Sequence, residues 1–131
     1  MIKKRAWFLV MAVSVCVPLI TACNKNSAAT EALRALRKIE AATEVGVSYQ
    51  QYGPLVIEAQ AQVNEAKAKL PDGELKTLLE QTILIYAKVG ELWGLQIQNN
   101  RTNNKEANDT KQQGWRIASE NIKKISKLVG E

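Results

Sequence analysis

The sequence predicts an all-α protein, an antiparallel bundle of about four helices that follows a cleaved N-terminal signal peptide. Three observations indicate this fold class. Beyond residue 30, apolar residues recur every three or four positions, turn-forming residues interrupt the pattern at intervals, and no stretch alternates apolar and polar residues as a half-buried strand does. The chain of 131 residues is long enough for one such domain.

The first residues have the pattern of a secretory signal peptide. Lys3, Lys4 and Arg5 form a basic start, residues 6–20 carry no charge, and small residues follow. The uncharged stretch has 15 residues, whereas a helix that spans a membrane needs about 20. A cleaved signal is therefore favoured over an uncleaved anchor helix.

The end of this segment is more specific. Ile20, Thr21, Ala22 and Cys23 form a sequence that resembles the lipobox of bacterial lipoproteins, in which an aliphatic residue, a small residue and Ala or Gly precede a cysteine. The resemblance implies cleavage after Ala22 and lipidation of Cys23, so residues 1–22 are the signal peptide. The alternative is an ordinary signal peptide followed by a chance cysteine.

The resemblance also implies a location. A lipidated Cys23 places the protein at the cell envelope, facing the periplasm, with membrane lipid as its first partner, because several acyl chains together hold a protein stably on a membrane. The next residue is Asn24 rather than aspartate, which implies the outer membrane if the cell is Gram-negative. Residues 23–29 are short and polar, and we expect them to form a tether to a bundle domain at residues 30–131.

The first helix is expected to begin at a cap formed by Ser27 or Thr30. Its apolar face follows helical spacing, with Leu33, Leu36 and Ile39. Gly53 and Pro54 form the first clear break in the pattern, because glycine commonly ends helices and proline commonly opens them. We therefore expect the first helix to reach this break and the second to start from Pro54.

The second and third helices follow from apolar faces on either side of a turn. The face expected for the second helix comprises Val56, Ala59, Val63, Ala66 and Leu70. Residues 70–73 have the composition of a turn. The third helix has the strongest pattern and is expected to be central, with the stripe Leu75, Leu79, Thr82, Tyr86, Val89, Trp93 and Ile97, widened by Leu78, Ile83, Ile85, Leu92 and Leu95.

Residues 98–108 contain five asparagines and are expected to form a surface loop. The spacing of residues 109–112 matches a capping box, so the fourth helix is expected to start near Asp109 and to end at Gly130. Its apolar face is Trp115, Ala118, Ile122, Ile125 and Val129. Trp93 and Trp115 would then each lie roughly 8–9 Å from the loop at about 1.5 Å per residue, which predicts that they pack in one layer.

Composition excludes several kinds of site. The chain has no histidine, so it cannot form a His-based triad, an HExxH zinc site or the Glu-x-x-His pair of di-iron bundles. It also lacks the Gly-rich phosphate loops and the GxSxG turn. We therefore expect no enzyme activity, no metal and no cofactor.

Charge gives no reason to expect nucleic acid. The whole chain has 18 basic and 13 acidic side chains. Cleavage removes Lys3, Lys4 and Arg5, which leaves 15 basic against 13 acidic. A nearly balanced mature chain does not indicate a nucleic-acid partner.

The leading hypothesis is a lipid-anchored helical bundle that acts as a non-enzymatic adaptor or structural partner of another envelope protein. The alternative is a periplasmic module that holds an apolar small molecule between its helices. The residues singled out as a candidate partner or ligand surface are Tyr86, Trp93 and Trp115.

Overall fold

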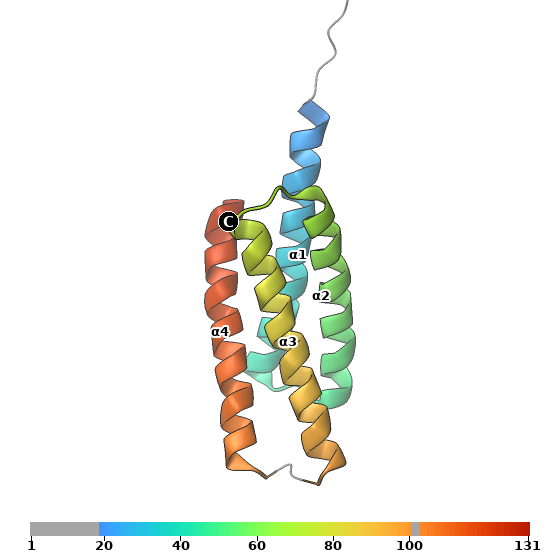
Figure 1. The fold of residues 1–131 in the computed structure, drawn as a ribbon, viewed down its shortest axis with the longest axis vertical. Coiled ribbons are helices and arrows are strands. Elements are labelled where there is room, and N and C mark those ends of the chain that lie inside the picture. The colour runs from blue at the N-terminus through green and yellow to red at the C-terminus, as the bar shows by residue number, and fades with distance from the viewer. Residues whose placement is uncertain (1–18, 101–102) are drawn as a thin grey trace, which may run out of the picture.

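The computed structural model describes residues 19–100 and 103–131, which form the helices α1 (Leu19–Val45), α2 (Tyr49–Lys69), α3 (Glu74–Gln98) and α4 (Lys105–Val129) without any strand. The helices run alternately up and down, so the α2–α3 turn and the C-terminus share one end of the bundle, from which α1 protrudes (Figure 1). The predicted antiparallel bundle is confirmed. Residues 1–18, most of the predicted signal peptide, lie outside the described residues.

The helices pack as a closed ring of neighbours. The pairs α1–α2 and α3–α4 have the most extensive contacts, α2–α3 and α4–α1 complete the ring, and the diagonal contact between α1 and α3 is slight. The largest fully buried side chains come from all four described helices: Leu33, Leu36, Ile39, Tyr52, Val63, Leu79, Thr82, Tyr86 and Ile125. The buried faces of α2, α3 and α4 therefore follow the predicted spacing.

The N-terminal boundary of the bundle differs from the prediction. Residues 23–29, expected to form a tether, are part of helix α1, and Ala28 and Ala29 are buried. Alanine is the best helix former and its small side chain is easily covered, so this stretch continues the helix. Ser27 and Thr30 accordingly lie inside α1 and do not cap it.

The break between the first two helices also lies earlier than predicted. Gly46 has a φ of +96°, a left-handed conformation that ends α1 at little cost because glycine has no Cβ. Ser48 then caps α2: its Oγ accepts from the Gln51 backbone N–H at 3.3 Å, and its own N–H donates to Gln51 Oε1 at 3.2 Å. Pro54 lies inside α2, where its missing N–H removes one backbone hydrogen bond.

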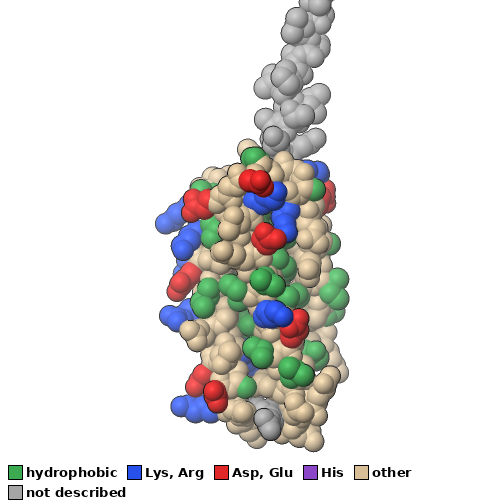
Figure 2. Space-filling view, in the orientation of Figure 1, with side chains coloured by type: hydrophobic (Ala, Val, Ile, Leu, Met, Phe, Trp, Pro, Cys, Tyr) green, Lys and Arg blue, Asp and Glu red, His purple; other side chains and the backbone are tan. Residues whose placement is uncertain are grey.

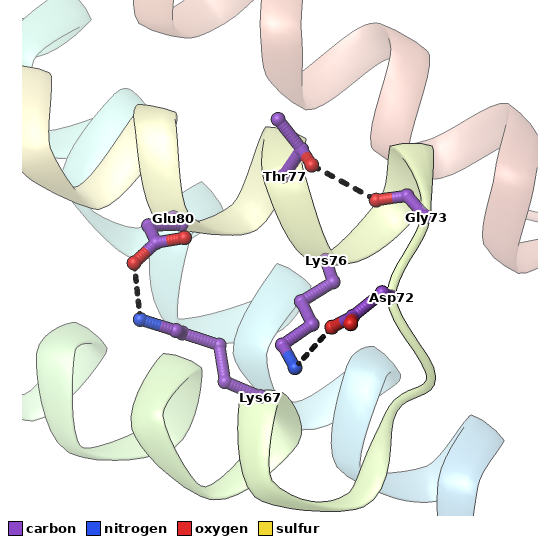
Figure 3. A network of polar contacts seen from close by, with 6 residues as sticks. All are labelled: Lys67, Asp72, Gly73, Lys76, Thr77 and Glu80. Carbon is purple, nitrogen blue, oxygen red and sulfur yellow. Dashed lines mark hydrogen bonds and ion pairs between the residues drawn. The ribbon is translucent and has the colours of Figure 1, made fainter.

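The predicted turn at residues 70–73 is confirmed, and polar contacts surround it (Figure 3). The Thr77 hydroxyl donates to the Gly73 carbonyl at 3.0 Å. Lys76 pairs with Asp72 at 2.9 Å and lowers the pKa of that carboxyl group. Lys67 of α2 pairs with Glu80 of α3. Exposed ion pairs of this kind contribute little to stability, because water and salt screen them.

The loop between α3 and α4 is shorter than predicted. It comprises residues 99–104, because Asn104 caps α4 by accepting from the Ala107 backbone N–H at 3.4 Å. The predicted capping box at residues 109–112 lies inside α4. None of the helices in residues 19–100 and 103–131 is long and apolar enough to cross a membrane.

Candidate functional site

The predicted contact between the two tryptophans is present. The rings of Trp93 and Trp115 lie edge to face, with centroids 5.9 Å apart. Tyr52 of α2 contacts both, at 5.6 Å from Trp93 and 6.1 Å from Trp115, and Tyr49 lies 5.6 Å from Trp93. These four residues form the aromatic cluster, which joins α2, α3 and α4.

Hydrogen bonds fix the centre of the aromatic cluster. The Tyr52 hydroxyl donates to the Tyr86 carbonyl at 2.8 Å and accepts from Trp115 Nε1 at 3.4 Å. Burial raises the pKa of Tyr52 from 10.0 to about 12. Lys111 covers the outer side, with its ammonium 4.3 Å from the Trp93 centroid, and burial lowers the pKa of that amine. Tyr52 is buried, both tryptophans are half-buried and Tyr49 is 40% exposed, so the cluster packs between the helices and keeps an exposed edge.

Tyr86 does not share a surface with the tryptophans. It is fully buried, and its hydroxyl has no hydrogen-bond partner within the described chain. Burial raises the pKa of Tyr86, and the nearby Glu40 adds to that rise. Its place in the middle of the α3 stripe puts Tyr86 under the neighbouring helices, so it presents no surface to a partner, and its role in a ligand site between the helices stays a prediction.

A surface that the sequence did not indicate runs along α3 and α4, and we call it the α3–α4 groove. Its volume is about 360 Å³, and apolar residues of both helices line it. Ile85, Val89 and Gly114 lie low in it, and its edges carry Leu84, Leu92 and Ile117, which are 56%, 44% and 39% exposed. Figure 2 shows apolar side chains gathered over the middle of this face.

Within the groove, Gly114 of α4 lies against the side chain of Val89 of α3. A Cβ at this position would lie 2.6 Å from Val89 Cγ2, so a larger residue fits only if Val89 or the helices shift. Larger residues flank this contact and remain exposed. They are Leu84 and Leu92 on α3 and Ile117 on α4. The third helix was predicted to have a very wide apolar stripe, and its outer edge forms one wall of the groove.

A second cavity, which we call the end pocket, lies beside the groove towards the α3–α4 loop. The two share Leu92 and Thr110, and the end pocket has a volume of about 280 Å³. Gln96 lines it and is only 7% exposed, and its Nε2 has no hydrogen-bond partner in the described chain. The remaining lining residues are Leu95, Asn99, Asn104, Glu106 and Ala107.

A third cavity, of about 400 Å³, lies between α1 and α4 and is polar. Its lining includes Glu40, Glu44, Arg116 and Ser119, and the Ser119 hydroxyl donates to Glu40. A triad needs an imidazole between serine and carboxylate, and this chain has no histidine. Among the described residues, no group of His, Cys, Asp and Glu side chains is arranged to hold a metal ion.

The predicted processing residues lie at the start of the structure. Ala22 and Cys23 fall within the first turns of α1, on the same helix that enters the bundle. Lipidation of Cys23 and cleavage after Ala22 remain predictions based on the lipobox.

No protein-family model, no curated protein sequence and no solved structure matches this chain. Its function is therefore inferred from its own residues, above all from the lipobox and the α3–α4 groove.

Proposed function

We propose that this protein is a lipid-anchored, non-enzymatic adaptor of the bacterial cell envelope, and that its α3–α4 groove binds an apolar segment of a partner protein. The observation that carries the proposal is the row of exposed apolar side chains Leu84, Leu92 and Ile117 along one groove. A contiguous apolar surface on a small protein commonly marks an interaction site. Grooves between helices are a recurrent way to bind the apolar face of another helix.

The proposed anchor is the lipid on Cys23, in the outer membrane if the cell is Gram-negative. Because Cys23 belongs to helix α1, a lipid there would hold the bundle by a helix rather than by a loose tether. The α3–α4 loop lies at the opposite end of the bundle from the start of α1 (Figure 1). Since α4 has 25 residues, this end would face the periplasm about 37 Å from the other, at about 1.5 Å per residue.

The alternative function, a module that holds an apolar small molecule between Tyr86, Trp93 and Trp115, has less support. Tyr52 contacts both tryptophan rings, so an aromatic side chain of the protein already fills the space that such a molecule would occupy. Tyr86 is fully buried. The α3–α4 groove, in contrast, is open and apolar.

Affinity purification of the acylated protein from its own envelope tests the proposal. The variant Ile117→Arg puts a charge on the groove, and Ile57→Arg is the matched control, because Ile57 is an apolar residue of α2, 72% exposed. We expect a stoichiometric protein partner that is lost with Ile117→Arg and kept with Ile57→Arg. Equal recovery with both variants would contradict a role for the groove, and a bound small apolar molecule without any protein would favour the alternative.

A further inference from the structure

The last turns of α4 carry three exposed lysines, Lys123, Lys124 and Lys127. None of them forms an ion pair within the described chain. Leu128 is 46% exposed, and it follows Lys124 by four residues, so the two side chains are neighbours on one face of the helix. These four residues form the lysine patch. Unpaired cations around an exposed apolar side chain are suited to an anionic lipid surface.

The other side of the same end of the bundle has a different charge pattern. Lys67, Lys69 and Lys76 of α2 and α3 are each paired with a carboxylate. Glu74, at the start of α3, has no ion pair among the described residues. On α4, Glu120 lies one turn before the lysine patch and offsets only one of its three lysines. Unpaired positive charge is therefore in excess on the α4 side of this end and not on the α2–α3 side.

The proposed anchor holds this end of the bundle near the membrane. The C-terminus of α4 lies at the end from which α1 protrudes (Figure 1), and Arg37 of α1 contacts Ser126 and Glu131 of α4. Arg37 follows Cys23 by fourteen residues of one helix, which is about 21 Å at about 1.5 Å per residue. An upright bundle would hold the lysine patch beyond the Debye length of about 8 Å, so contact with lipid requires the bundle to lean.

We infer that the bundle leans on the membrane with its α4 side, so that the lysine patch contacts anionic phospholipid headgroups and Leu128 enters the headgroup layer. This inference rests on the lipid anchor of the proposed function. The anchor brings this end close to the membrane, and the unpaired charge selects the side. A lean towards the α2–α3 turn would instead bring the unpaired Glu74 carboxylate towards the same headgroups, which repel it. Each lysine close to an anionic surface strengthens the contact about fivefold.

Fluorescence of the acylated protein in lipid vesicles tests the direction of the lean. Cys16 leaves with the signal peptide and Cys23 is acylated in the proposed function, so an introduced cysteine is the only free thiol for a polarity-sensitive dye. Leu128→Cys puts the dye in the lysine patch. Pro71→Cys is the control, because Pro71 is exposed in the α2–α3 turn at the same end of the bundle.

We expect the dye at position 128 to shift to the blue when phosphatidylcholine vesicles are replaced by equal parts of phosphatidylcholine and phosphatidylglycerol. The dye at position 71 should not shift. Salt at about 1 M, where the Debye length is about 3 Å, should reverse the shift. No shift at position 128, or an equal shift at position 71, would overturn the inference. A shift seen only in native membranes and removed by protease would assign the patch to an acidic protein and overturn it too.

Lys124→Gln and Lys105→Gln are a matched pair of variants, because both lysines are exposed residues of α4 without an ion pair, one near each end. In the dye-labelled protein, Lys124→Gln should lower the ratio of leaning to upright molecules about fivefold, and Lys105→Gln should leave it unchanged. Equal effects would overturn the inference, because net charge alone would then explain the shift.

Flotation of the same protein with phosphatidylcholine vesicles tests the anchor separately, since these vesicles have no net charge. A protein that floats with them but shows no shift on the anionic vesicles would overturn the inference and leave the proposed anchor intact. A protein that does not float would overturn the proposed anchor, and the inference with it.

Discussion

Replacing Gly114 by alanine tests the close contact that forms the floor of the α3–α4 groove. The added Cβ would lie 2.6 Å from Val89 Cγ2 and 3.7 Å from Ile85 Cγ2. Carbon atoms prefer separations of about 3.5–4.0 Å, so the first contact is a clash. Val89 cannot rotate away at little cost, because β-branching restricts its χ1 angle in a helix. The two helices must therefore move apart or Val89 must adopt a strained rotamer.

Two opposing effects determine how much Gly114→Ala changes the free energy of unfolding. Overpacking of a tight contact costs about 1–3 kcal/mol, whereas alanine stabilises a helix interior by about 1 kcal/mol relative to glycine. We expect Gly114→Ala to lower the free energy of unfolding by roughly 0–2 kcal/mol. In a Val89→Ala background the clashing methyl group is gone, so the same change should stabilise by up to about 1 kcal/mol.

Urea unfolding of the parent, both single variants and the double variant measures this coupling. A chain of residues 24–131, without signal peptide and lipidated cysteine, is suitable, with circular dichroism as the readout. The expected coupling between positions 114 and 89 is about 1–3 kcal/mol. If Gly114→Ala changes stability by the same amount in both backgrounds, the helices do not meet at Gly114 and this account of the groove is wrong.

Three further predictions concern the tyrosines, the tryptophans and the anchor. Burial raises the pKa of Tyr52 from 10.0 to about 12, so the unfolded state releases this proton at a lower pH than the folded state. The free energy of unfolding should therefore be constant below pH 10 and fall as the pH rises towards 12. Unfolding curves that do not change over this range would contradict the prediction. Trp93 and Trp115 should emit at blue-shifted wavelengths with weak acrylamide quenching, and Trp93→Ala should cost about 3 kcal/mol, whereas strongly quenched emission with little loss of stability would mean exposed rings. Cys23→Ser should abolish acylation and release the protein from membranes, as fractionation and acyl labelling would show; a variant that is processed and membrane-bound like the parent would refute the lipoprotein prediction.

The helical periodicity of the apolar residues predicted most of the fold. The spacing of Val56, Ala59, Val63 and Ala66 identified the buried face of α2, and loop geometry brought Trp93 and Trp115 into one layer. These predictions succeeded because the faces of an antiparallel bundle are set by the 3.6-residue repeat, and because short connections make consecutive helices neighbours.

Several residues near each helix end could stop or cap the helix, and the apolar periodicity does not show which of them does. Gly53 and Pro54 gave a strong break signal, but Gly46 adopts a positive φ and Ser48 forms a complete capping box with Gln51. The glycine turn and the capping box satisfy unpaired backbone N–H and C=O groups at the end of α1 and the start of α2, so the chain turns there. Similarly, Asn104 caps α4 before the predicted cap at Asp109 is reached.

The candidate site was harder to foresee than the fold. Leu92 and Leu95 were assigned to the apolar stripe of the third helix, but they lie beyond the reach of the neighbouring helices and stay exposed. The stripe alone does not show which of its edges a neighbour covers. Gln96, between the apolar residues Leu95 and Ile97 in the sequence, gave no signal at all, because its unpaired amide follows from packing rather than from pattern.

Site-specific photo-cross-linking in the living envelope tests whether the α3–α4 groove binds a partner protein. A photoreactive residue replaces Leu92 in the α3–α4 groove, and in a control it replaces Ile57, which is exposed on α2 away from the groove. We expect a discrete cross-linked protein from position 92 that is absent from position 57 and disappears when Ile117→Arg is added. Cross-links of equal yield from both positions, or none from position 92, would contradict the adaptor function proposed for the groove.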